Sequence, residues 1–252
     1  MTLWTPSHVK TIIPEFIVFA ILAVCLWLLL RNKSETVRRI PLMVIAVTLV
    51  VMEIFKQIAS FEEGVYDTYS LPFHYCSLFL YVLPLHAFYR GKHKGAVTAI
   101  AVSLSAAVIM SMLIMPEIIY SEYRITEYFD DYLNFHSVTF HGLVCLYFMI
   151  AVAMGLARTD LVPSIKTVSV FLVVFELIAY PLAQILETNF HNLYEFEIEA
   201  FEEIRLAIFE EYGNTIGMGV HFLANLFATV AFTLVAYLIF YFAEKAYEKI
   251  KK

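Results

Sequence analysis

Seven apolar stretches follow one another along the chain, each about as long as a membrane crossing requires. A helix that spans a bilayer needs about 20 mostly apolar residues. The stretches cover roughly residues 13–30, 41–59, 72–89, 95–115, 135–157, 162–186 and 218–242. The pattern predicts an all-α, polytopic membrane bundle of seven transmembrane helices, folded as a single transmembrane domain over residues 1–252.

Composition agrees with this pattern, since 61% of the residues are hydrophobic and only 16% are charged. Soluble domains carry about a quarter charged residues. The first stretch does not resemble a cleavable signal peptide, because it lacks a small-residue cleavage site and its basic residues follow the apolar run. The basic residues lie in short flanks between apolar runs, which does not indicate a nucleic-acid partner.

Charge alternates between successive connections. Basic residues follow the first, third, fifth and seventh stretches, whereas acidic residues dominate the other connections. Cytoplasmic loops of membrane proteins carry the excess of lysine and arginine. We therefore predict a cell-membrane protein with its N-terminus outside and its C-terminus in the cytoplasm.

An acidic segment at residues 190–213 separates the last two stretches on the predicted outer side. Its apolar residues recur every three or four positions with glutamates between them, and Gly213 is well placed to end a helix. We interpret it as an outer amphipathic helix. It would lie in the interface or cover an outward-facing site as a lid.

Polar side chains collect at the outer ends of four predicted helices. Isolated polar residues in spanning helices usually face the bundle interior. The residues in question are Glu53, Lys56, Gln57, His74, Cys76, Asn134, His141, His221 and Asn225. Their convergence at one level predicts a site near the outer headgroups.

Several of these residues also have structural interpretations. Lys56 would extend to the interface with Glu53 as its partner. His221 and Asn225, four residues apart on the last helix, would form hydrogen bonds that join this helix to a neighbouring one. His136 is expected at the interface, and the deeper Glu176 has no obvious partner in the sequence.

Cys76 is the favoured nucleophile because a thiolate can carry an acyl group while an imidazole moves the proton. Pro72 suits the first turn of a helix, so Cys76 is expected near a helix N-terminus, where the thiol pKa falls. Cys145 is four residues from His141 but lies deeper, where desolvation disfavours a thiolate. His74 would lie about 200° around the helix from Cys76, whereas His141 can approach from another helix.

The run Leu71-Pro72-Phe73-His74-Tyr75-Cys76-Ser77 resembles the Leu-Pro-(Leu/Phe)-His-Leu-Cys-Asn signature of the YwaF-like family of bacterial membrane proteins, with Ser77 in place of asparagine. Phe140-His141-Gly142 and Glu53-x-x-Lys56 resemble two further motifs of that family. The family is similar to a eukaryotic multi-pass phospholipid acyltransferase that uses a cysteine thioester. This resemblance implies Cys76 as the acyl-carrying nucleophile and His141 as its base.

Together these observations predict an acyltransferase that moves a lipid acyl chain through a cysteine thioester at the outer leaflet. Membrane phospholipids would be donor and acceptor, and neither a cofactor nor a metal is required. The sequence leaves protein partners unknown. The predicted substrate-binding residues are Glu53, Lys56, His74, Asn134, His221 and Asn225.

Two other functions remain open. A transporter or lipid-binding membrane protein without catalysis would be favoured by helices broken at mid-membrane, and Pro84 and Pro181 offer two possible kinks. A seven-helix zinc-dependent lipid hydrolase needs three histidines and a water. His221 and Asn225 have the spacing of a pair of zinc ligands, but Asn225 stands where the second histidine would be needed, so the site is one ligand short.

Overall fold

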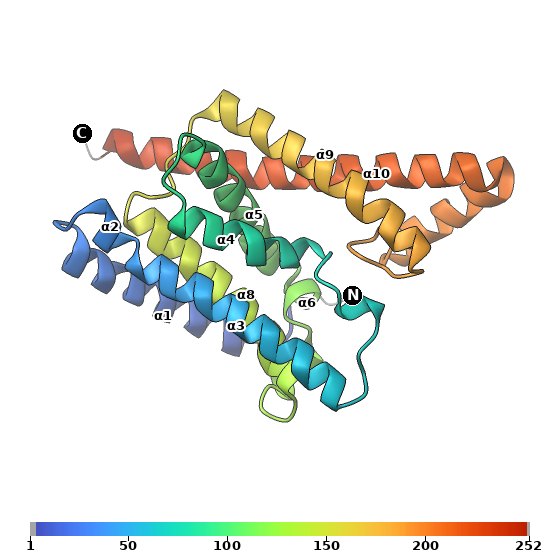
Figure 1. The fold of residues 1–252 in the computed structure, drawn as a ribbon, viewed down its shortest axis with the longest axis horizontal. Helices are drawn as coiled ribbons and strands as arrows, with labels where there is room; N and C mark the ends of the chain where they lie inside the picture. The colour runs from blue at the N-terminus through green and yellow to red at the C-terminus, as the bar shows by residue number, and fades with distance from the viewer. Residues whose placement is uncertain (1–3, 251–252) are drawn as a thin grey trace.

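The computed structural model describes residues 4–250, and within that range every regular element is helical (Figure 1). Seven segments are long and apolar enough to cross a membrane, which confirms the predicted all-α class and the number of spans. The short helices between the spans are α2 (Glu35–Arg38), α6 (Pro116–Ile119) and α7 (Glu122–Thr126). The spans themselves are formed by α1 (Pro6–Leu30), α3 (Ile40–Glu62), η1 (Thr68–Ser70) with η2 (Tyr75–Leu78) and α4 (Phe79–Phe88), α5 (Lys94–Ile114), α8 (Tyr132–Ala153), α9 (Leu161–Ile185) and α10 (Glu199–Ile250).

The helices form two groups joined through the middle of the bundle. Helix α8 packs between α1 and α3, and α9 packs against α10 on the other side (Figure 1). Helices α4 and α5 contact each other, and α5 also contacts α8, α9 and α10. Small buried residues of α5, such as Ala101, Ser103 and Ala107, allow this close approach of several helices.

The third span differs from the prediction at its start. Pro72 does not open a helix: Leu71 and His74 have extended backbone, η2 is a short 3₁₀ turn, and α4 begins only at Phe79. The proline ring disfavours helical backbone at the residue before it, which explains the extended Leu71. Cys76 therefore lies in the 3₁₀ turn that precedes α4, not in the first turn of a long helix.

The last helix doubles back on itself at Gly213, where φ is 78° and ψ is 170°. This backbone conformation is essentially confined to glycine. The amphipathic helix covers residues 199–212, while residues 190–198 form no regular element. Phe209 packs directly over Gly217 beyond the break, so the two parts form the hairpin visible at the orange end of α10 (Figure 1).

Because the spans alternate in direction, the connections 63–67, 115–131 and 186–198 lie at one end of the bundle. The connections rich in lysine and arginine lie at the other. The first of these ends carries most of the polar side chains described next.

Candidate functional site

His141 presents one ring nitrogen with no partner. Its Nδ1 lies 2.7 Å from the carbonyl oxygen of Ser137, one helical turn earlier. A carbonyl oxygen only accepts, so Nδ1 carries the proton and Nε2 keeps its lone pair. That Nε2 is buried and forms no hydrogen bond among the described residues. Buried acceptors without a partner are uncommon, and this one has the chemistry of a general base.

The three cysteines have different surroundings. Cys76 is partly exposed in the 3₁₀ turn, and Cys25 is exposed on α1. Cys145 is fully buried, with its Sγ 3.3 Å from the Sδ of Met112. Burial and this sulfur contact leave Cys145 no access to a lipid, which favours Cys76 as the reactive thiol.

Helix α8 and the η2 turn both contact one small cluster of alanines. Phe148 lies seven residues after His141 and therefore on the same face of the helix. Both Phe148 and Tyr75 pack against one small cluster, formed by Ala106, Ala107 and Ala236. Tyr75 immediately precedes Cys76, so this cluster links the η2 turn to α8.

Arg124 of α7 adds a positive charge to this region. Its Nη1 donates a hydrogen bond of 3.0 Å to the Ser137 hydroxyl. Ser137 is the residue whose carbonyl oxygen accepts from His141, so Arg124 contacts the turn of α8 that holds this imidazole. Arg124 was not among the predicted site residues, because nothing in the hydrophobic pattern shows that its connection folds back over α8.

A second cluster joins α3 to α8. The Nζ of Lys56 lies 2.6 Å from Glu53 Oε1, the pairing that their spacing predicts, and Gln57 donates to the same oxygen at 2.7 Å. His136 Nε2 lies 3.3 Å from the other oxygen, Oε2. The side chain of His136, near the start of α8, is buried against this carboxylate, and its predicted place at the membrane interface stays a prediction.

Glu176 has partners that the sequence did not reveal. Asn225 donates to its carboxylate at 3.1 and 3.4 Å, and His191 Nε2 lies 3.9 Å from Oε1. His191 also lies 2.9 Å from the Thr229 hydroxyl, and burial lowers the pKa of His191 to about 4. Asn225 thus forms the interhelical hydrogen bond expected of it, to Glu176 on the neighbouring helix α9.

The remaining predicted substrate residues bind backbone carbonyl oxygens. His221 Nε2 lies 2.8 Å from the carbonyl of Asn192, and His74 Nε2 lies 2.9 Å from that of Tyr69. Asn134 donates to the carbonyl of Glu127 at 3.4 Å. These three side chains anchor connections at the polar end of the bundle, and the structure does not bring them into one cluster.

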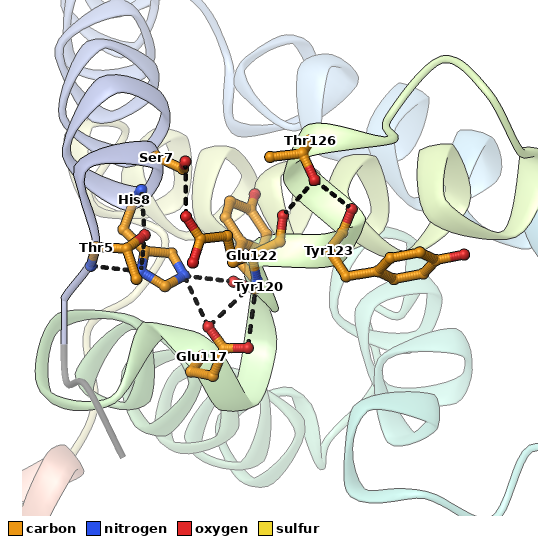
Figure 2. Close-up of polar contacts among 8 residues, drawn as sticks. All are labelled: Thr5, Ser7, His8, Glu117, Tyr120, Glu122, Tyr123 and Thr126. Atoms are coloured by element: carbon orange, nitrogen blue, oxygen red, sulfur yellow. Dashed lines mark hydrogen bonds and ion pairs between the residues drawn. The ribbon is translucent and has the colours of Figure 1, made fainter.

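A third network, around the N-terminal turn of α1, was missed altogether. His8 is completely buried, and its Nε2 lies 2.7 Å from the Tyr120 carbonyl and 3.4 Å from Glu117 (Figure 2). The Tyr120 hydroxyl donates to Glu15 of α1. A carboxylate inside an apolar stretch is the sequence feature that could have revealed Glu15.

The described residues contain no group of three or more His, Cys, Asp or Glu side chains arranged to hold a metal ion. The zinc-hydrolase hypothesis therefore lacks a ligand set in residues 4–250.

The bundle contains cavities, including one of about 260 Å³ beneath the amphipathic helix 199–212 and one of about 500 Å³ beside Glu15.

Comparison with known proteins gives one match. The model of the TMEM164 family matches residues 3–209, whereas neither a curated protein nor a solved structure matches the chain. The matching family is not the YwaF-like bacterial family, so the resemblance drawn from the motifs around Cys76, His141 and Glu53 pointed to the wrong family. The family match covers most of the chain and comes with seven apolar helices, and the chain therefore belongs to the TMEM164 family.

Proposed function

We propose that this multi-pass membrane protein transfers acyl chains between membrane phospholipids, with Cys76 as nucleophile and His141 as general base. The proposal is supported by one observation above the others: His141 keeps a buried, unpartnered Nε2 lone pair. Its helix α8 packs on the same alanine cluster as Tyr75, the neighbour of Cys76.

The reaction follows the two half-reactions of covalent catalysis. The Cys76 thiol gives its proton to His141 Nε2 and its sulfur attacks the ester carbonyl of a donor lipid. The ester C–O bond then breaks, the leaving alkoxide takes the proton from His141, and the acyl group remains on Cys76 as a thioester. An acceptor hydroxyl next gives its proton to His141 and attacks the thioester, and the proton returns to the departing sulfur.

The surrounding charges support the same chemistry. Arg124, which hydrogen bonds to the Ser137 hydroxyl on α8, would supply positive charge to stabilise the oxyanion of the tetrahedral intermediate. Lys56, held by Glu53, would bind a lipid phosphate as a point charge. Both the donor and the acceptor reside in the bilayer, so the reaction draws on no soluble cofactor.

The proposal also assigns an orientation. The charge bias of the connections favours an extracellular N-terminus and a cytoplasmic C-terminus in the cell membrane. Under this orientation the polar end of the bundle, with Cys76 and His141, faces the outer leaflet.

The thioester is the direct test. Purified protein incubated with phospholipid carrying a tagged acyl chain should gain a hydroxylamine-labile tag. Cys76→Ala should abolish the tag, and His141→Ala should slow its formation by about a hundredfold or more. Cys25→Ala and Cys145→Ala are the matched controls and should keep it.

If Cys145→Ala loses the tag and Cys76→Ala keeps it, the nucleophile is Cys145 and the assignment of Cys76 is wrong. If wild-type protein is never labelled across several lipid classes, lipid binding without catalysis becomes the better function. The specific observation in favour of that second candidate is the cavity of about 260 Å³, lined largely by apolar side chains, between residues 199–212 and the rest of α10.

A further inference from the structure

The side chain of Glu15 occupies space that is left free because residue 142 is a glycine. Helix α1 carries this carboxylate into the bundle, where it lies against Gly142 of α8. A Cβ atom at position 142 would overlap Glu15 Oε1 and press on the Tyr120 hydroxyl. The absence of a side chain at Gly142 is therefore what allows a carboxylate to occupy this place.

Tyr120 fixes the carboxylate from the other side. Its hydroxyl lies 3.1 and 3.0 Å from the two oxygens of Glu15. Burial, and then the charge of Glu15, raise the pKa of Tyr120 well above its usual range, so the hydroxyl stays protonated and donates. The Tyr120 backbone is held by the buried His8 (Figure 2). The position of the carboxylate is thus set before any ligand arrives.

The carboxylate borders a cavity of about 500 Å³ between α1, the α7 region and α8. Aromatic rings of Phe19, Tyr128 and Phe129 line it, together with the threonines Thr11, Thr126 and Thr139. Neither lysine nor arginine is among its lining residues. In the part of the chain that the structure describes, Glu15 has no ion-pair partner closer than 4 Å, and the neighbour that hydrogen bonds to its side chain is Tyr120.

We propose that this cavity binds an organic ammonium group, with Glu15 as the counter-charge. A carboxylate beside aromatic faces is the arrangement that recognises quaternary or primary ammonium ions, since the ring faces attract the cation. A hard metal ion would instead require six or more oxygen ligands, and the cavity supplies a single carboxylate. The ammonium group belongs either to a lipid headgroup or to a soluble amine. The inference does not depend on acyl transfer, because it involves neither Cys76 nor His141.

Binding can be measured on the full chain in an uncharged detergent. Tetramethylammonium chloride should raise the thermal unfolding midpoint of the wild type in a saturable manner, and sodium chloride at equal ionic strength should not. Native mass spectrometry with a choline phospholipid and a phosphatidylglycerol of the same chains tests the lipid source. Glu15→Gln should weaken binding in both arms by about tenfold or more, the loss expected when one partner of a desolvated charge pair is removed.

Two further variants sharpen the test. Glu122→Gln removes a nearby exposed carboxylate and should bind like the wild type. Gly142→Ala keeps the charge of Glu15 but displaces the carboxylate, and should bind as weakly as Glu15→Gln; if it does not fold, Glu15→Gln decides alone. Stabilisation by tetramethylammonium alone identifies a soluble amine, and selective retention of the choline lipid identifies a headgroup. Unchanged binding in Glu15→Gln, an equal effect of sodium, preference for phosphatidylglycerol, or no binding in either arm overturns the proposal.

Discussion

Glu53 shows how one carboxylate can tie two helices together at the polar end of the bundle. Both of its oxygens are used, one by Lys56 and Gln57 of its own helix and the other by His136 of α8. A buried ion pair adds little net stability, but removing one partner leaves the other charge uncompensated. The contribution of this cluster to folding stability should therefore be measurable when one of its charged partners is removed.

Lys56→Met should destabilise the folded protein by about 2 kcal/mol or more, because Glu53 would lose its strongest cation inside the bundle. Thermal unfolding of purified protein measures this change. The matched control is Lys166→Met, at an exposed position near the start of α9, which should leave the midpoint nearly unchanged. Equal midpoints for the two variants would show that Lys56 is dispensable for the fold.

His191 should make stability depend on pH. Its pKa is lowered to about 4 by burial in the folded protein, against about 6.5 in an unfolded chain. Between these values the unfolded state binds a proton that the folded state does not, so stability is full above pH 6.5 and falls as the pH drops toward 4. His191→Gln should therefore lose less stability than the wild type between pH 7.5 and pH 5.

The control for this comparison is His93→Gln, since His93 is exposed between α4 and α5. Its pH profile should follow that of the wild type. A His191→Gln profile that also coincides with the wild type would contradict the assignment.

The site residues that sequence reasoning found and missed differ in one respect. Cys76, His141 and Glu53 stand inside or at the edge of apolar stretches, where a polar side chain is conspicuous. Arg124 and His191 lie in connections, where polar residues are ordinary, and only the folding of those connections over the spans brings them to the site. Hydrophobic pattern carries no information about that folding.

The break at Gly213 is the sharpest feature among the elements. It ends the amphipathic helix and reverses the chain, so that residues 199–212 pack on the beginning of the final span. A side chain at this φ and ψ would be strained, whereas the exposed Gly219 lies in ordinary helix with open space around it.

Gly213→Ala should therefore cost about 1–3 kcal/mol, and Gly219→Ala should be neutral or stabilising by up to about 1 kcal/mol. Thermal unfolding compares the two glycines directly. If both variants unfold at the same temperature, the backbone at position 213 does not constrain the hairpin.

The sequence predicts helices correctly where an apolar stretch alone determines the structure. It fails where the local backbone conformation, such as that next to a proline, determines where a helix begins. The apolar stretches of α5 and α9 match the predicted spans to within about a residue. The stretch after Leu71 is less apolar, with a mean hydropathy of 1.3 against 2.3 and 2.0 for those two spans. Pro72 holds Leu71 in extended backbone, and α4 starts only at Phe79. Apolar length therefore locates a span without specifying how the chain enters it.

At the scale of the whole molecule, the two ends of the bundle differ in charge. Most acidic residues and most polar clusters lie at one end, and most lysine and arginine residues lie at the other. This asymmetry is the basis for the proposed orientation.

A cysteine at position 197 should react with a membrane-impermeant reagent applied to intact cells, and a cysteine at position 92 should not. Both positions lie in connections between spans, and wild-type protein sets the background from its own three cysteines. The reverse labelling pattern would place Cys76 and His141 at the cytoplasmic leaflet.

The late start of α4 has a consequence for the surrounding lipid. Its 10 residues cover about 15 Å, half of the roughly 30 Å of hydrocarbon in a typical bilayer. The whole span, with η1 and η2, runs from Thr68 to Phe88, and local thinning of the membrane is one way to accommodate so short a regular helix within it. Under the proposed function, thinning beside η2 would bring the ester groups of neighbouring lipids closer to the Cys76 thiol. Thioester labelling would then be faster in short-chain bilayers than in long-chain ones.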